Sequence, residues 1–195
     1  MTRTSLSSLG LAAGWTPQQV ASPARLVWPL PGEGAVIEGQ IDRICACWNN
    51  QPFVTSYLDA SAPFLENVSI LENIWVPLAW RRRVRPIELI RRAQRLLPPL
   101  GWDGDDLRRL LACRPGDLTP AVLGRAVLLR AALANPDWLL IEPGWFERPL
   151  LPPHELTSLV QSLLGECRWL LLWPAQRQPL PSGVSWHTIP MEAEA

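Results

Sequence analysis

Apolar residues in this chain fall into short continuous runs and into longer segments with helical spacing. A short apolar run bounded by Pro, Gly or polar residues indicates a strand that is buried on both faces, as in a parallel sheet. Such runs predict strands at 25–28, 54–58, 138–141 and 169–173. Apolar residues three and four positions apart predict helices. We expect helices at 40–48, 87–97, 105–111, 120–133 and 154–164, and a short one within 15–24.

The most informative stretch is 114–142, which begins with the turn sequence Arg-Pro-Gly-Asp. Asp117 or Thr119 is placed to cap the helix that follows. Pro120 falls in the first turn of that helix, where the missing N–H has no cost. Asn135-Pro136 ends the helix. A continuous apolar run then predicts a buried strand.

A second informative stretch is 31–48, where a Pro-Gly-Glu-Gly turn opens the segment. We expect 35–39 to be a strand and 40–48 to be a helix, because apolar residues at 41, 44, 45 and 48 share a helical face. The loop between them would then be reduced to about Glu38-Gly39-Gln40. A loop that short cannot wrap a triphosphate with successive backbone N–H groups, and Glu38 would add negative charge there.

Length and composition predict one domain, 1–195, with a sizeable core. The segments 1–24 and 178–195 are expected to be peripheral, and the N-terminus lacks the features of a signal peptide. The formal charge is zero, which gives no electrostatic argument for nucleic acid. No apolar run approaches the ~20 residues that span a bilayer. The four cysteines are expected to be reduced core residues, and no metal site is predicted.

The chain contains no lysine, and every basic residue other than its two histidines is arginine. A phosphate-binding loop of the form GxxxxGK[ST] uses its lysine to reach the β and γ phosphates. The sequence therefore excludes an intact loop of this kind anywhere in the chain, and we expect no bound nucleotide cofactor.

The order of elements in 114–143 resembles the ATP-binding domain of ABC transporters. In that family an LSGGQ signature opens a helix, an N-x-P turn follows, and a strand ends in Asp-Glu-Pro. The corresponding segments here are 118–122, 125–133 and 139–143. The segment 64–74 is similar to the family's L-(T/S)-V-x-E-N region. The resemblance covers roughly 31–175.

This resemblance implies an α/β fold of the P-loop NTPase-like type, with a mostly parallel sheet flanked by helices. It also implies a small helical subdomain at 77–113 and a reduced N-terminal β region. In transporters the region like 65–80 forms the groove for the membrane subunit. The partner-binding residues implied here are therefore Leu65, Leu71, Ile74, Trp75, Trp80, Arg81, Arg82 and Arg83. The arginine run is either a solvated face or a dock for acidic loops or lipid headgroups.

The same resemblance places catalytic counterparts that are mostly changed. The magnesium-binding Asp corresponds to Ile141, the sensing Gln to Asp59 and the switch His to Ala175, and only Glu142 is kept. In the signature, Thr119, Pro120 and Ala121 replace the Ser and two Gly residues, and the phosphate loop near Gly39 is lost. Each such contact is worth a few kcal/mol of transition-state stabilisation. We therefore expect a degenerate ABC ATPase domain that is not an enzyme, with Glu142 a solvated or capping residue.

Other enzyme classes have weaker support. Neither His154 nor His187 has a neighbouring carboxylate or cysteine that suggests a triad or a metal site. The expected partners are a membrane permease, an intact ABC ATPase subunit or both, and a homodimer stays open. The expected location is the cytoplasmic side of the inner membrane. Two alternatives also stay open: a divergent ATPase that uses Glu142 with a partner's phosphate loop, and a soluble adaptor unrelated to transport.

Overall fold

The computed structural model describes residues 16–59, 64–82, 84–147, 153–177 and 179–189. Within this part of the chain, five strands form one sheet in the order β2-β3-β4-β1-β5, and every neighbouring pair is parallel. The strands are β1 (Arg25–Leu30), β2 (Thr55–Leu58), β3 (Trp138–Ile141), β4 (Arg168–Pro174) and β5 (His187–Thr188). The four strands predicted from apolar runs are therefore confirmed.

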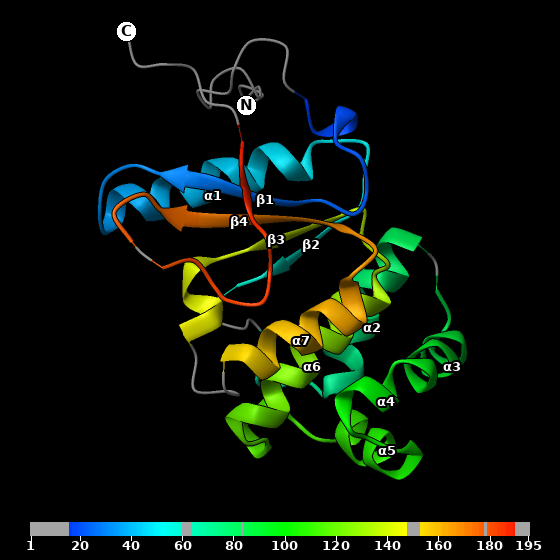
Figure 1. The fold of residues 1–195 in the computed structure, drawn as a ribbon. Helices are drawn as coiled ribbons and strands as arrows, with labels where there is room; N and C mark the ends of the chain where they lie inside the picture. The colour runs from blue at the N-terminus through cyan, green and yellow to red at the C-terminus, as the bar shows by residue number, and fades with distance from the viewer. Residues whose placement is uncertain (1–15, 60–63, 83, 148–152, 178, 190–195) are drawn as a thin grey trace, which may run out of the picture.

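Helices cover both faces of this sheet (Figure 1). Helix α1 (Ala35–Asn49) packs on one face, whereas α6 (Pro120–Leu133) and α7 (Pro153–Leu164) pack on the other. The remaining helices extend the second layer away from the sheet: α2 (Ile70–Arg82), α3 (Pro86–Arg95), α4 (Leu97–Leu100) and α5 (Gly104–Ala112). Three short 3-10 helices are η2 (Pro17–Gln19), η3 (Pro115–Asp117) and η4 (Pro143–Glu147). None of the described helices is long and apolar enough to cross a membrane.

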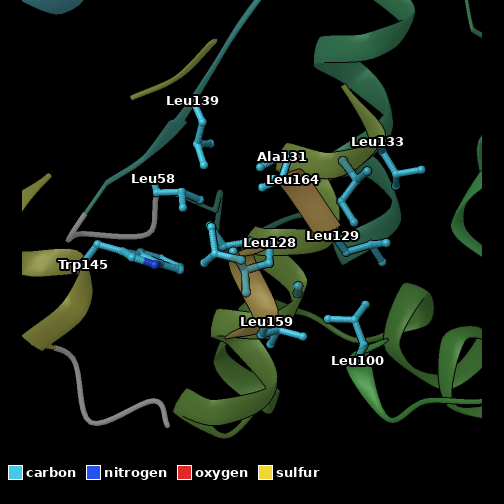
Figure 2. Close-up of a cluster of buried hydrophobic side chains, with 14 of the residues drawn as sticks. Leu58, Leu100, Leu128, Leu129, Ala131, Leu133, Leu139, Trp145, Leu159 and Leu164 are labelled. Carbon is cyan, nitrogen blue, oxygen red and sulfur yellow. The ribbon is translucent and has the colours of Figure 1, made fainter. Parts of the chain in front are cut away.

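The larger core lies between the sheet and the α6–α7 layer. Leu128 and Leu129 of α6 meet side chains from the sheet, from α7 and from η4 (Figure 2). Trp145 of η4 is fully buried there. This packing explains why α6 has almost no polar face and why its apolar content exceeds that of an ordinary surface helix.

The smaller core lies under α1 and is built from aromatic rings. Trp48 of α1 packs edge-on against Trp28 of β1 at 5.9 Å and against Trp138 of β3 at 5.7 Å between ring centroids. Edge-to-face pairs at this separation add stability beyond the area that they bury. The tryptophans of the strands therefore fix α1 to its face of the sheet.

The predicted start of α6 is confirmed. Thr119 has extended backbone angles, and its hydroxyl accepts a hydrogen bond from the Val122 N–H at 3.4 Å. Pro120 occupies the first helical position. The helix is followed by Asn135, whose positive φ of 45° takes the chain out of the helical conformation. Thr119-Pro120 therefore marks the start of the helix and Asn135-Pro136 its end, as the sequence predicted.

The prediction of a strand at 35–39 is wrong. These residues form the first turn and a half of α1, and the strand that precedes the helix is β1. Ile37 packs against the same core as Ile41, so its burial follows the helical period rather than the alternation of a strand. The loop between strand and helix is therefore 31–34, and Gly39 lies inside the helix.

The prediction that 178–195 is peripheral is wrong for the residues that form β5. His187 and Thr188 pair with β1, and the Ile189 N–H donates to the Val27 carbonyl at 3.0 Å. Ile189 is buried in the smaller core, because it closes the edge of the sheet beside β1. Residues 1–15 and 190–195 lie outside the described residues, and so do 60–63, 83, 148–152 and 178.

Candidate functional site

The carboxyl ends of the parallel strands bring four chain segments to one edge of the sheet. They are the loop after β1 and the residues that directly follow β2, β3 and β4, which are Asp59, Glu142 and Ala175. Backbone hydrogen bonds hold these segments together: the Ala175 N–H donates to Leu30 at 2.9 Å and the Glu142 N–H donates to Leu58 at 3.0 Å. Ligands of open α/β sheets bind outside this edge. The structure thus gathers three residues that the family resemblance pairs with catalytic positions.

The loop between β1 and α1 occupies the place of a phosphate-binding loop. Gly32 and Gly34 have positive φ angles of 89° and 52°, a conformation that glycine adopts without strain. If Gly34 is taken as the last glycine of GxxxxGK[ST], the lysine position is Ala35 and the hydroxyl position is Val36. Val36 is 57% exposed to solvent. The loop therefore keeps one glycine of the motif, Gly34, beside an exposed apolar side chain rather than a cation, and Pro29 stands at the position of the first glycine.

The charge beside this loop is negative. Glu33 lies in the loop and Glu38 lies in the first turn of α1, and both side chains are exposed. A helix N-terminus attracts anions through its free N–H groups and its dipole. Two carboxylates at the same place oppose that attraction, so the start of α1 is a poor site for a polyphosphate.

Glu142 is engaged by a side chain that was not predicted from the sequence. The Tyr57 hydroxyl of β2 donates a hydrogen bond to the Glu142 carboxylate. Burial is the main cause that raises the pKa of Tyr57 well above its ordinary value, and the bond to Glu142 adds to it. Burial also raises the pKa of the neighbouring Cys45 of α1 to about 11. The Tyr57 hydroxyl and the Cys45 thiol therefore stay protonated, and with Glu142 they form a half-buried cluster between α1 and the sheet.

Two further counterparts near this edge, Ile141 and Asp59, differ in character from Glu142. Ile141 is fully buried in the larger core, so its position offers no oxygen ligand to a metal ion. Asp59 lies beside Arg130 of α6, whose guanidinium carbon sits 4.6 Å from the centroid of the Phe64 ring. Burial lowers the pKa of Arg130, and the Asp59 carboxylate opposes this effect. Among the described residues, no cluster of His, Cys, Asp and Glu could hold a metal ion.

A pocket of about 310 Å³ opens beside β2, the edge strand of the sheet. Residues of β2, α2 and α6 form most of its wall, among them Thr55, Pro77 and Arg130. The Thr55 hydroxyl oxygen is buried and has no hydrogen-bond partner. The pocket is therefore mainly apolar, with one orphaned hydroxyl and the oppositely charged side chains of Asp59 and Arg130 in its wall. Of the pocket residues, only Ile74 and Asp59 were singled out from the sequence.

The residues predicted to bind a partner differ in their exposure to solvent. Leu65 is 68% exposed and Trp80 is 90% exposed, as an interface requires. Ile74 is fully buried, so a partner could not contact its side chain directly. Leu71 and Trp75 are half-buried against the core, and the Trp75 indole donates to the Val84 carbonyl at 2.9 Å. The side chains of Arg81 and Arg82 and the whole of Arg83 lie outside the described residues.

Val76 of α2 was not predicted from the sequence, and it is 51% exposed. It lies one helical turn before Trp80, so the two apolar side chains share a face of the helix. The sequence contained the signal that could have identified Val76, because an apolar residue four positions before Trp80 falls on the same face of a helix.

The signature counterparts Thr119 and Pro120 are exposed, Ala121 is half-buried, and Gly39 is exposed on α1.

The chain has the fold of the ATP-binding cassettes of ABC transporters, an α/β fold of the P-loop NTPase-like type. One similar structure is the bacterial ABC transporter cassette MJ0796, solved as a dimer, with a TM-score of 0.53 and 15% sequence identity over 78% of this chain and 77% of that one. Another is the ATP-binding subunit of an ABC transporter, with a TM-score of 0.54 and 17% identity over 84% of this chain and 77% of that one. No family model matches the chain. No curated protein matches it either.

Proposed function

We propose that this protein is a non-hydrolysing subunit or regulator of an ABC-type membrane transport complex, and that it acts by binding other proteins. The observation that carries the proposal is the loop 31–34, which leads into Ala35 and Val36 where a nucleotide-binding loop has Lys and Ser or Thr. Without that lysine, the β and γ phosphates lose their main cationic contact.

The state of Glu142 supports the same conclusion. A carboxylate that positions or activates water must present an oxygen to that water in the reacting complex. Here one carboxylate oxygen accepts the Tyr57 hydroxyl, and the cluster is half-buried between α1 and the sheet. Phosphoryl transfer also needs a metal ion to neutralise the developing charge. The neighbouring Ile141 supplies no ligand for one.

Exposed apolar side chains on α2 and in the segment before it support a role in binding. Leu65 and Val76 are exposed, and Pro77 lines the pocket beside β2. An apolar surface beside a preformed pocket is typical of a protein interface, since buried apolar side chains anchor such contacts. We define Leu65, Val76 and Pro77 with the pocket beside β2 as the partner surface.

The fold supports the identity of the partner. Cassettes of this fold belong to ABC transporters, so the partner surface is proposed to contact a membrane permease, an intact ATPase subunit or both. The protein would then work on the cytoplasmic face of the membrane. A homodimer is compatible with this proposal, because the similar cassette MJ0796 is described as dimeric.

Affinity capture from detergent-solubilised membranes tests this proposal. Wild-type protein is compared with Leu65→Glu/Val76→Glu, which places two charges on the partner surface. Val36→Glu is the matched control, because Val36 is a similarly exposed apolar residue on α1. We expect a permease or ATPase subunit in the wild-type and control samples and its loss from the double variant.

Two results would contradict the proposal. Capture of only non-membrane proteins, unaffected by the double variant, would favour a soluble adaptor. ATP hydrolysis by the captured complex that depends on Glu142 of this chain, tested with Glu142→Gln, would favour a divergent ATPase that borrows a phosphate loop.

A further inference from the structure

One part of the surface carries a concentrated positive charge although the whole chain is neutral. Residues 81–95 contain seven of the 18 basic residues and a single acidic residue, Glu88. Arg92 of α3 pairs with that glutamate at 2.5 Å, so these two charges cancel. Arg85, Arg91 and Arg95 are exposed, and none forms an ion pair with another described residue. Three positive charges therefore remain open to solvent.

Two large exposed apolar side chains belong to the same part of the chain. Ile87 is 53% exposed. It shares one face of α3 with Arg91 and Arg95, since these residues follow one another at intervals of four positions. Trp80 is 90% exposed near the end of α2. The end of α2 and helix α3 lie on the same side of the molecule (Figure 1), and the Trp75–Val84 hydrogen bond ties α2 to the segment that enters α3.

We infer that Trp80, Ile87, Arg85, Arg91 and Arg95 form a basic–aromatic patch that binds an anionic membrane surface. Arginines near such a surface are attracted to its phosphate headgroups. Tryptophan is enriched at the level of those headgroups, where its ring is buried and its N–H stays polar. The patch thus combines an electrostatic and an apolar contribution, which peripheral membrane binding requires.

The exposure of Trp80 favours a membrane over an acidic protein. Aromatic anchors of protein interfaces sit in pockets whose rims exclude water. Trp80 protrudes almost fully into solvent and does not line the pocket beside β2. A bilayer interface accepts such a side chain without a matching cavity, so the shape and the charge of the patch agree. The arginines of the patch lie on α3 or just before it, outside the partner surface, whereas Trp80 shares a face of α2 with Val76, and vesicle binding through the patch needs no permease.

Co-sedimentation with lipid vesicles tests the inference. Purified full-length protein is mixed with vesicles of phosphatidylcholine alone or of phosphatidylcholine and phosphatidylglycerol in equal amounts. We expect binding to the anionic vesicles only, and weaker binding at high salt, because screening reduces the attraction. Since one arginine contributes about a fivefold effect, Arg91→Gln/Arg95→Gln should lower the partition coefficient about 25-fold.

Two further variants complete the experiment. Arg43→Gln/Arg114→Gln removes two exposed arginines from other parts of the chain and should bind like wild type. Trp80→Ser should also lose binding. Because the Trp80 side chain is exposed, the far-UV circular dichroism of this variant should match that of wild type. Gln and Arg have similar helix propensity, so the α3 variant should stay folded.

The inference is overturned if wild type ignores the anionic vesicles, if it binds neutral vesicles equally, or if the α3 variant binds like the control. Retention on immobilised polyglutamate without vesicle binding, lost in Arg91→Gln/Arg95→Gln, would also overturn it and assign the patch to an acidic protein. Because the vesicles contain no protein, these results are independent of the capture experiment for the partner surface.

Discussion

At the scale of single residues, the contact between Tyr57 and Glu142 is the feature of the candidate site that the sequence did not predict. The sequence identified Glu142 as the retained carboxylate, and the structure places it at the carboxyl end of β3. Its partner could not be predicted, because the contact depends on the register in which Tyr57 lies opposite Leu140. That register is set by non-local pairing of β2 with β3, which one-dimensional patterns do not contain.

Removal of the Tyr57 hydroxyl should destabilise the fold. A hydrogen bond to a charged group is worth about 1.5–3 kcal/mol when its partner is left unsatisfied, so Tyr57→Phe should lower the free energy of unfolding by about 2 kcal/mol. Urea denaturation measures this as a lower midpoint with an unchanged m-value. In a Glu142→Gln background the effect should shrink. Equal losses in both backgrounds would show that the hydroxyl does not act through Glu142.

Stability should fall in alkaline solution. Burial raises the pKa of the Cys45 and Cys167 thiols from 9.0 to about 11. Between these values the unfolded chain loses thiol protons that the folded chain keeps, so the unfolded state binds fewer protons and the free energy of unfolding decreases as pH rises. The contribution is fully present below about pH 9 and is lost as pH approaches about 11. Urea denaturation under reducing conditions measures this decline.

The matched variant for this prediction is Cys45→Ala/Cys167→Ala, which removes the half-buried thiol of Cys45 and the buried thiol of Cys167. Its free energy of unfolding should decline less steeply between about pH 9 and pH 11 than that of wild type. The raised pKa of Tyr57 leaves a smaller decline in the variant. Identical slopes in the two proteins would mean that these thiols do not titrate differently on folding.

At the scale of elements, the bounds of α6 and β3 were predicted well and the start of α1 was not. The bounds of α6 and β3 follow from a cap, a proline and an apolar run that act locally. In contrast, Val36 and Ile37 favour a strand by propensity, yet they lie in α1 because Ile37 packs one turn before Ile41. Tertiary packing overrides local propensity in such short apolar runs. The candidate phosphate loop lies at 31–34 and was therefore wrongly predicted near Gly39.

Two glycine substitutions test this revised boundary. Gly39 lies inside α1 with open space where an added Cβ would lie, so Gly39→Ala should raise the free energy of unfolding by about 0.5–1 kcal/mol. Gly32 has a φ of 89°, and an added Cβ would lie 3.0 Å from the Val36 side chain. Gly32→Ala should therefore be destabilising. Thermal or urea denaturation of both variants measures these changes in stability. A lower stability of Gly39→Ala would indicate that the loop lies near Gly39 rather than at 31–34.

At the scale of the whole molecule, the fold of the ATP-binding cassettes is combined with a β1–α1 loop that leads into Ala35 and Val36 rather than into Lys and Ser or Thr. The resemblance of 114–143 to ABC ATPases predicted the class of fold, and the similar solved structures confirm it. The parallel sheet and the helices on both faces preserve the layout in which such a site would form. What the resemblance could not predict is which surfaces are exposed for binding, since the exposed faces of α2 and α3 depend on tertiary packing.

The most direct test of the central claim is equilibrium binding of Mg-ATP to the purified full-length protein by isothermal titration calorimetry. We expect no measurable heat of binding at ATP concentrations up to about 1 mM, because Glu33 in the loop and Glu38 in the first turn of α1 offer carboxylates rather than a cation to the phosphates. Circular dichroism of the same sample checks that the protein is folded. Saturable binding with a dissociation constant in the micromolar range would contradict the claim that this cassette has lost its nucleotide site.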